Sequence, residues 1–407
     1  MLEADVVIGA NLGDEGKGLF TDYLSSRYDA PIIIRYNGGA QAGHTVETPD
    51  GMRHVFSHFG SGSFAGGSTY LSRFFVVNPL LFLRELQTLE SLHLKPLVMV
   101  APDCPVTTPF DMMVNQIAEE ARGNARHGSC GVGFGETIGR HEETAHHLRV
   151  QDLTTAALRS KLEDLRDIWL PARLLRLGIR KIPAVWIERL NAPALIDNFI
   201  GACQAFLDQV RLCTLADIGL RRQRLIFEGA QGLLLDQSHD WFPHVTRSYT
   251  GLRNVVELAE EVGVGQLNVN YATRSYLTRH GAGPLPFELQ EKPYEKIIDL
   301  TNKPHPFQGT LRFAPLNFDL LTQSIMADMA HADGRLKVNA RLAVSCMDQV
   351  DATALFINGG RRCNAPPLAM VNALLRRLGW RHCTLSYGPT RATIEADAKL
   401  NRQLYAV

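Results

Sequence analysis

A glycine-rich loop between an apolar run and a helical pattern constrains the fold of this chain most. Residues 5–10 are rich in Val and Ile, the loop GDEGKG occupies residues 13–18, and residues 17–28 have helical spacing. A buried strand, a loop and a helix in this order open a βα unit. A second apolar run at 31–36 leads into another glycine-rich loop at 37–45. The start of the chain therefore predicts parallel strands with loops at a common edge.

The same alternation continues along the rest of the sequence. Residues 80–95, 111–122 and most of 151–220 have helical patterns, and further short apolar runs read as strands at 96–100, 224–228, 342–346 and 382–386. Strands that alternate with helices indicate a large, mainly parallel central sheet with helices on both faces, an α/β fold. The sequence shows no internal repeat, low-complexity tract or linker, so we expect one elaborated α/β domain over residues 1–407.

Composition and charge narrow the function classes. The chain has 407 residues, with 42 basic and 42 acidic side chains and 45% apolar residues. A balanced charge argues against a protein that coats nucleic acid or an anionic membrane. No apolar run approaches the roughly 18 residues of a membrane span, and the first residues do not have the pattern of a signal peptide. We therefore expect a cytoplasmic protein with neither nucleic acid nor membrane as a partner.

The first loop has the composition of a phosphate-binding site. Glycines allow backbone N–H groups to approach phosphate oxygens, and the following helix N-terminus favours negative charge. Lys17 can neutralise a phosphate, whereas Asp14 would repel one unless it holds Mg²⁺ or takes a proton. The spacing differs from that of the ordinary P-loop. A glycine-rich turn with a solvated acidic pair is the alternative interpretation of these residues.

The second loop carries His44 directly after a strand. A histidine in this position can act as a general acid or donate a hydrogen bond to an oxyanion, although a lone histidine is more often structural. Because ligands of α/β proteins bind at the carboxyl edge of the sheet, both glycine loops should open onto one site.

Six motifs in a fixed order then carry a resemblance that spans nearly the whole chain. They are GDEGKG at 13–18, RYNGGAQAGHT at 35–45, EGAQG at 228–232, FPHVT at 242–246, TRHGAGPLP at 278–286 and SYGPTR at 386–391. Together they resemble adenylosuccinate synthetase. In that family GTP phosphorylates the 6-oxygen of a purine nucleotide, and the amino group of aspartate then displaces the phosphate.

The resemblance implies roles for the residues of the two loops. Asp14 would take the proton from N1 of the base and hold Mg²⁺, with the backbone oxygen of Gly43 as a second metal ligand. His44 would donate towards the transferred phosphoryl group, and Lys17 would stabilise its charge. Positioned acid–base groups of this kind contribute about 10²–10⁴-fold each.

The resemblance also implies two sets of nucleotide contacts. Asp348 would read the guanine of GTP, since a carboxylate accepts both N1–H and N2–H₂ of that base. Contacts to the donor nucleotide or its phosphates are expected at Gly13, Glu15, Gly16, Gly18, Gly43, Thr45, Asp348, Ser386 and Gly388. Contacts to the purine substrate are expected at Gln41, Ser129, Cys130, Arg140, Gln231 and Thr246. For Gln231 and Thr246, hydrogen bonding within a turn is the alternative.

Several positions depart from the family pattern. Gln41 replaces an asparagine near the substrate, Cys130 replaces a threonine and Val132 replaces an arginine of the phosphate-gripping loop. Arg140 is the candidate for the arginine that the family donates across a dimer interface. Cys346 replaces a lysine beside the guanine, so ATP is an alternative donor.

The amino-acid loop departs most. GTLRFAP at 309–315 replaces an arginine-rich loop that holds both aspartate carboxylates, which leaves Arg312 as its guanidinium and Thr310 as a hydroxyl. One arginine can grip one carboxylate bidentately, but two separated carboxylates usually need more positive charge. Lys303, His305 and Arg279 are the nearby cations that could supply it.

We therefore expect a homodimeric carbon–nitrogen ligase that uses a purine nucleotide, an amino acid, GTP and Mg²⁺, with IMP and aspartate as default substrates. A synthetase of the 2-aminoadenylosuccinate type, acting on GMP or dGMP, is the alternative within the family. A GTP-binding regulatory module without ligation is the alternative from another class. A plain kinase or phosphatase has no need for His44 and a guanine-reading Asp348 together.

Overall fold

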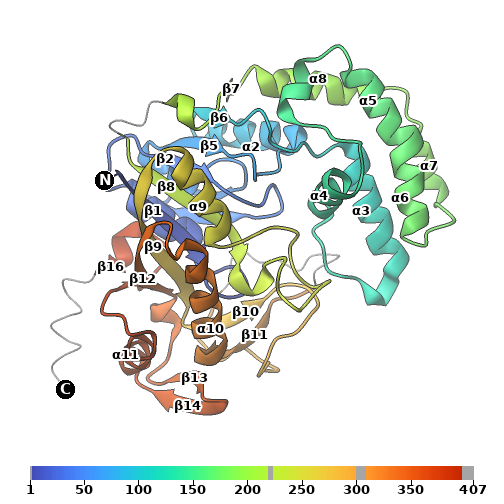
Figure 1. The fold of residues 1–407 in the computed structure, drawn as a ribbon. Coiled ribbons are helices and arrows are strands. Elements are labelled where there is room, and N and C mark those ends of the chain that lie inside the picture. Colours follow the sequence, from blue (N-terminus) through green and yellow to red (C-terminus); the bar gives the residue numbers. More distant parts are fainter. Residues whose placement is uncertain (1, 219–222, 299–308, 397–407) are drawn as a thin grey trace.

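The computed structural model describes residues 2–218, 223–298 and 309–396. A ten-stranded sheet runs through the molecule, and its neighbouring strands pair in parallel except for the last pair at one edge (Figure 1). In spatial order the strands are β16 (Ile394–Glu395), β15 (Cys383–Ser386), β12 (Lys337–Ser345), β9 (Val264–Arg274), β1 (Leu2–Gly9), β8 (Leu225–Gly232), β2 (Ile32–Arg35), β5 (Ser68–Leu71), β6 (Val98–Val100) and β7 (Arg211–Leu212).

Helices cover both faces of this sheet. Successive residues of a strand point to opposite faces, and β1 is buried on each. Val6 belongs to the main hydrophobic core together with Val255 of α9 (Leu252–Glu261), whereas Val7 belongs to a separate cluster with Phe20 of α1 (Lys17–Ser25). The predicted α/β fold with a large, mainly parallel sheet is therefore confirmed.

Eleven α-helices lie in the described part of the chain. Helices α5 to α8 lie together at the periphery, beyond β6 and β7 (Figure 1). The helices are α1 (Lys17–Ser25), α2 (Pro79–Ser91), α3 (Pro109–Arg122), α4 (Phe134–Glu143), α5 (Leu158–Asp164), α6 (Leu170–Arg176), α7 (Ala184–Leu190), α8 (Leu195–Leu207), α9 (Leu252–Glu261), α10 (Phe318–Met329) and α11 (Pro367–Leu378).

Two smaller sheets lack a counterpart in the expected pattern. Four strands form one sheet below the main sheet in Figure 1, and two strands form a hairpin directly after the second glycine loop. The four are β10 (Tyr276–Arg279), β11 (Arg312–Asn317), β13 (Ala354–Asn358) and β14 (Arg361–Ala365), and the hairpin joins β3 (His44–Glu47) to β4 (Arg53–Phe56).

The ten-stranded sheet takes strands from both ends of the described chain, from Leu2 to Glu395. The assignment of residues 1–407 to one domain stays a prediction. None of the helices in the described ranges is long and apolar enough to cross a membrane.

Candidate active site

The candidate site lies at the carboxyl edge of the main sheet. Strand β1 pairs in parallel with β8 and β9, β8 with β2, and β9 with β12. Parallel strands end at the same edge, so the loops that follow these five strands meet there. The expectation that both glycine loops open onto one edge is therefore consistent with the strand order.

Glu15 organises the first glycine loop. Its Oε1 accepts hydrogen bonds from the backbone N–H of Asn11 at 3.1 Å and of Gly13 at 2.7 Å, and its Oε2 lies 2.6 Å from Lys17 Nζ. Glu15 and Lys17 are buried, with 2% and 4% of their surface exposed. Glu15 is thus an internal brace, which corrects its interpretation as part of a solvated pair, and its expected contact with nucleotide stays a prediction. Lys17 is held at the loop by the same carboxylate.

Backbone geometry keeps the loop open to a ligand. Gly13, Asp14 and Gly16 have φ angles of 89°, 64° and 86°, in the left-handed region that favours glycine. Gly18 is the second residue of α1 and lies against the β3 strand, where a Cβ would be 2.9 Å from the carbonyl oxygen of Thr45. A side chain at residue 18 would therefore separate the two predicted phosphate loops.

The Asp14 carboxylate faces two side chains from the end of the sheet. Arg274, the last residue of β9, places Nη2 at 2.6 Å from Asp14 Oδ2, and its Nε donates to the Asp14 carbonyl oxygen at 2.5 Å. His280 Nε2 lies 3.8 Å from the same carboxylate oxygen. The sequence predicted Asp14 but gave no role to Arg274, which lies 260 positions away along the chain.

His44 is oriented by a buried carboxylate. Its Nδ1 lies 2.6 Å from Oε1 of Glu228, and Ser61 N donates to Glu228 Oε2 at 3.0 Å. Burial would raise the pKa of Glu228, but Arg35, His44 and Ser61 together lower it to about 2. Burial lowers the pKa of His44, against the opposing effect of Glu228. Among the described residues, no group hydrogen-bonds to the buried Nε2 of His44, so this nitrogen is directed to a ligand or to water.

Three of the predicted purine contacts lie on the loops around this edge. Both amide atoms of Gln41 are buried and lack a hydrogen-bond partner among the described residues. Gln231, the last residue but one of β8, has a left-handed conformation with φ 66°. The Thr246 N–H donates to the Leu235 carbonyl oxygen at 2.8 Å, eleven positions earlier in the chain, and its contact with the purine nucleotide stays a prediction. Gln41 is therefore the purine-side residue with the clearest unmet hydrogen-bonding capacity.

The loop that carries Ser129 and Cys130 is attached to α3. Asn115 Nδ2 donates to Ser129 Oγ at 2.8 Å, and the Gly128 N–H donates to Glu119 Oε2 at 3.0 Å. Burial raises the pKa of the Cys130 thiol. This loop also meets the glycine loop of the TRHGAGPLP motif, because a Cβ on Gly128 would lie 3.0 Å from Gly281 Cα.

Arg140 is the clearest correction to the predicted site. It lies on α4 with a fully buried side chain, and its Nε and Nη2 bind both carboxylate oxygens of Asp111 at 2.9 and 3.0 Å. Its remaining bonds go to the carbonyl oxygens of Val106 and His146. Arg140 joins α4 to the start of α3 and is not placed to contact substrate or a partner subunit.

The amino-acid loop also differs from the expectation. Arg312 starts β11 and binds Glu288, with Nε 2.7 Å from Oε1 and Nη2 2.5 Å from Oε2. Its Nη1 donates to the carbonyl oxygens of Gly281 and Gly283 at 3.0 and 2.9 Å. Thr310 is exposed. Glu288 thus occupies the bidentate position that a substrate carboxylate would take.

Arg279 is the one cation proposed for this loop, besides Arg312, that lies within the described residues. Arg279 is buried and donates to the backbone oxygens of Ala282, Pro284 and His244, so it supports the loop internally. Burial, with the nearby Arg312 charge, lowers the pKa of Arg279 to about 10. Lys303 and His305 lie outside the described residues.

The predicted guanine end lies after β12 and β15. Asp348 is largely exposed on a short 3₁₀ turn, Met347–Gln349, that follows β12. Partial desolvation of its carboxyl group raises its pKa, against the opposing effects of a backbone hydrogen bond and the Lys296 charge. Ser386 ends β15 and donates from Oγ to the Gly388 carbonyl at 2.7 Å. Ser345 Oγ donates to the Glu15 carbonyl at 3.0 Å and joins this end of the site to the first glycine loop.

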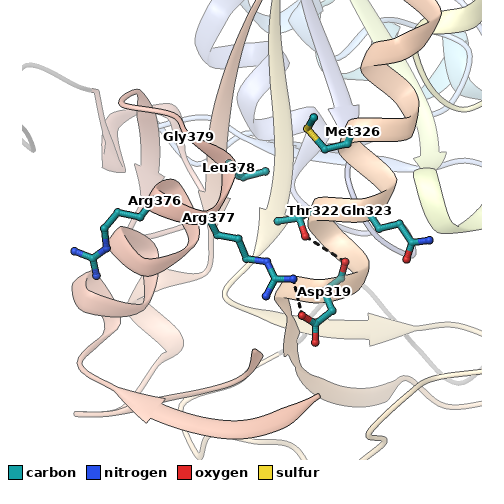
Figure 2. Close-up of a pocket in the computed structure, with 8 residues that line it drawn as sticks. All are labelled: Asp319, Thr322, Gln323, Met326, Arg376, Arg377, Leu378 and Gly379. Carbon is teal, nitrogen blue, oxygen red and sulfur yellow. Dashed lines mark hydrogen bonds and ion pairs between the residues drawn. The ribbon is translucent and has the colours of Figure 1, made fainter. Parts of the chain in front are cut away.

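A hollow of about 690 Å³ lies elsewhere, between α10 and α11. Figure 2 shows Asp319 and Arg377 paired across it. Its lining residues are Asp319, Thr322, Gln323, Met326, Arg376, Arg377, Leu378 and Gly379. None of these residues belongs to the glycine loops, so the hollow is separate from the candidate site.

The protein is thus an α/β protein with glycine loops, a lysine and an oriented histidine at the carboxyl edge of a parallel sheet. This arrangement is suited to phosphorylated ligands. The family model for adenylosuccinate synthetase matches residues 6–310. The adenylosuccinate synthetase of Pseudomonas fluorescens strain SBW25 is 32% identical over 318 residues, which cover 75% of this chain and 69% of that protein. The chain belongs to the adenylosuccinate synthetase family, a family of carbon–nitrogen ligases.

More distant relatives cover the chain almost completely. The adenylosuccinate synthetase of Legionella pneumophila strain Philadelphia 1 is 28% identical over 98% of this chain and 91% of its own length. The fully ligated adenylosuccinate synthetase of Plasmodium falciparum superposes with a TM-score of 0.72 at 18% identity, over 97% of this chain and 99% of that one. The succinoaminodeoxyadenylate synthetase of cyanophage S-2L, bound to dGMP and dATP, gives 0.63 at 16% identity, over 100% and 99%. At these identities the structures show a shared fold.

Proposed function

We propose that this protein is a ligase that phosphorylates the 6-oxygen of a purine nucleotide and then joins the purine to an amino acid. In the first step O6 attacks the γ-phosphorus of GTP, the bond to the β-phosphate oxygen breaks, and N1 loses its proton. In the second step the amino group attacks C6, and the C6–O6 bond breaks with loss of phosphate. By default the substrates are IMP and aspartate and the product is adenylosuccinate.

The unpartnered Nε2 of buried His44, beside the loop of Asp14 and Lys17, is the observation that carries this proposal. Asp14 would accept the N1 proton of the base, and Lys17 would neutralise phosphoryl charge. Because Glu228 binds Nδ1, Nε2 is the nitrogen left to face the phosphoryl group. Donation from Nε2 requires the protonated ring, which a neighbouring phosphate charge favours.

The donor set of the first loop fits Mg²⁺ that arrives with phosphates. Mg²⁺ commonly uses one or two carboxylates plus substrate phosphate oxygens and water, and the described residues contain no group of three His, Cys, Asp or Glu side chains that could hold a metal ion alone. The Asp14 carboxylate and the Gly43 carbonyl oxygen would hold the ion. When bound, it would neutralise the charge of the nucleotide phosphates.

The nucleotide and amino-acid contacts are proposed from the family motifs. Asp348 would read the guanine of GTP, and Gln41, Ser129, Cys130, Gln231 and Thr246 would line the purine nucleotide. Arg312 and Thr310 would hold a carboxylate of the amino acid, in exchange for Glu288. The family resemblance also supports a homodimer in the cytoplasm.

A matrix of reactants tests the proposal. The purified protein is incubated with IMP, GMP or dGMP, with each amino acid, and with GTP or ATP plus Mg²⁺, and products are identified by mass spectrometry. We expect phosphate release and a purine–amino acid conjugate that both depend on all three reactants. Nucleotide binding without a conjugate in any combination would contradict the ligase and favour a GTP-binding regulatory module.

A further inference from the structure

Arg274 makes an unusual set of contacts with Asp14. Its Nη2 binds the carboxylate at 2.6 Å and its Nε binds the backbone carbonyl of the same residue at 2.5 Å. One guanidinium therefore holds both the direction of the Asp14 side chain and the orientation of its peptide group. The side chain of Arg274 is only 13% exposed, against 28% for Asp14.

The backbone of Asp14 has an uncommon conformation. Its φ of 64° lies in the left-handed region, which few non-glycine residues occupy, although Asp adopts it more readily than most. Its two neighbours are held by other contacts. The Gly13 N–H donates to Glu15 Oε1, and the Glu15 carbonyl oxygen accepts a hydrogen bond from Ser345 Oγ. Arg274 supplies the corresponding contacts for Asp14 itself.

Arg274 is in turn held by the residues that follow β9 and β12. Its Nη1 donates to the Tyr276 hydroxyl at 3.2 Å, and that hydroxyl donates to Gln349 Oε1 at 2.5 Å. Burial raises the pKa of Tyr276, so its hydroxyl keeps the proton that it donates. Gln349 shares a short 3₁₀ turn with Asp348. The contacts thus run from the predicted guanine loop to the predicted catalytic carboxylate.

We infer that Arg274 is a positioning residue, which fixes the Asp14 carboxylate and its peptide group in the geometry that turnover requires. The inference rests on the proposed function in one respect, the role of Asp14 in catalysis. The contacts between Arg274 and Asp14 are independent of that function. A displacement of about 1 Å at a reacting group can cost about 10²-fold in rate. Loss of Arg274 should therefore lower kcat and leave the nucleotide KM values nearly unchanged.

Kinetics of matched variants test the inference. Arg274→Met should lower kcat by about 10- to 100-fold. Arg274→Lys should recover part of the loss, because an ammonium can hold one of the two Asp14 oxygens but lacks the planar fork that binds both. Arg335→Met is the control, since Arg335 also forms a bidentate pair with a carboxylate, that of Glu260, but on the exposed surface.

A double-mutant cycle with Asp14→Asn tests whether Arg274 affects kcat through Asp14. If Arg274 acts through Asp14, Arg274→Met should cause at most a few-fold further loss in the Asp14→Asn background. An equal fold-loss in both backgrounds, or a kcat of Arg274→Met within three-fold of the wild type, would overturn the inference. Should Arg274→Met fold poorly, Tyr276→Phe removes one contact of Arg274 and should lower kcat in the same pattern, but less.

Hydrogen exchange separates this inference from the proposed function. The peptide that contains Asp14 should exchange faster in Arg274→Met than in the wild type, and no faster in Arg335→Met. Unchanged exchange in Arg274→Met would overturn the positioning role even if the wild type is a ligase. If the wild type lacks ligase activity but the peptide with Asp14 still exchanges faster in Arg274→Met than in the wild type, the positioning role would be supported and only the proposed function contradicted.

Discussion

At the scale of single residues, the site depends on carboxylates that are held in different ways. Glu15 and Glu228 are buried, bonded to several donors and paired with Lys17 and His44. Asp14 is partly exposed and held at one edge by Arg274. Buried, fully bonded carboxylates orient other groups, whereas the accessible one is placed to react. This difference favours Asp14 over its neighbour in the same loop for the proposed role of base.

Asp14→Asn tests that assignment. The amide keeps the size of the side chain and removes its ability to accept a proton, so kcat should fall by about 10²–10⁴-fold while nucleotide binding is largely retained. Steady-state kinetics and equilibrium binding of GTP measure the two effects. Glu47→Gln, on the partly exposed β3 hairpin, is a control outside the loop. Activity of Asp14→Asn within a few-fold of the wild type would refute the base role.

Asp348 provides a second test at this scale. Adenine lacks the donors that Asp348 would accept from guanine, and the loss of a charged hydrogen bond costs about 1.5–3 kcal/mol. GTP should therefore be preferred over ATP by roughly ten- to a hundred-fold in kcat/KM. Asp348→Ala should narrow that gap. Equal kcat/KM values for the two nucleotides in the wild-type protein would argue against guanine recognition by this carboxylate.

At the scale of elements, the sequence predicted several strands that are buried on both faces, but it missed β5 and the central β9, which carry polar residues among their apolar ones. Residues 5–10, 31–36 and 224–228 are continuous apolar runs because β1, β2 and β8 lie inside the sheet. The strands β10 and β11 were missed because each mixes polar and apolar residues and pairs over a long separation in sequence. Pairings of this kind, and the contacts of Arg140 and Arg312 that depend on packing, leave no local pattern in the sequence.

The β10–β11 pair gives the next prediction. Arg312→Ala should raise the amino-acid KM by at least about ten-fold and leave the nucleotide KM values nearly unchanged, because a bidentate arginine–carboxylate contact is lost. Glu288→Gln is the matched variant, since it weakens the competing internal pair and should lower the amino-acid KM or leave it unchanged. An unaltered amino-acid KM in Arg312→Ala would show that the carboxylate is gripped elsewhere.

Helix α10 carries a buried carboxyl group that makes stability depend on pH. Asp328 accepts hydrogen bonds from the Leu252 N–H at 2.7 Å and the Tyr271 hydroxyl at 2.8 Å. Burial raises its pKa to about 7, against the opposing effect of these bonds. Since the folded state keeps this proton to higher pH than the unfolded state, the contribution of Asp328 to stability falls as pH rises from about 4 to 7.

Asp328→Asn removes this titration. The free energy of unfolding of the variant relative to the wild type should therefore be larger at pH 8 than at pH 5, as measured by urea denaturation at both values. Asp319→Asn, on the same helix, is the control. Arg377 and the Gly359 and Gly360 N–H groups outweigh burial and lower the pKa of Asp319, so its effect should be the same at pH 5 and pH 8. A pH-independent difference for Asp328→Asn would contradict the buried carboxylic acid.

At the scale of the whole molecule, the strand order assembles the site from distant segments. Placing β9 between β1 and β12 brings Arg274 to Asp14 and Ser345 to Glu15, across 260 and 330 positions of sequence. Motif spacing predicted the loops and their common edge, and the family resemblance supplied Asp14, Lys17 and His44. Neither of the two could predict the contact of Arg274 with Asp14 or the brace formed by Glu15, because these contacts depend on the order of the strands in the sheet.

In the proposed reaction, the 6-oxygen of the purine is phosphorylated before the amino acid displaces it. An oxygen-isotope measurement tests this most directly. The protein is incubated with the purine nucleotide labelled with ¹⁸O at position 6, together with GTP, Mg²⁺ and aspartate, and the released phosphate is analysed by mass spectrometry. Because the C6–O6 bond breaks after the new O6–phosphorus bond has formed, the account predicts one ¹⁸O atom in each phosphate released with product. Unlabelled phosphate, with the ¹⁸O retained on the purine or lost to water, would contradict it.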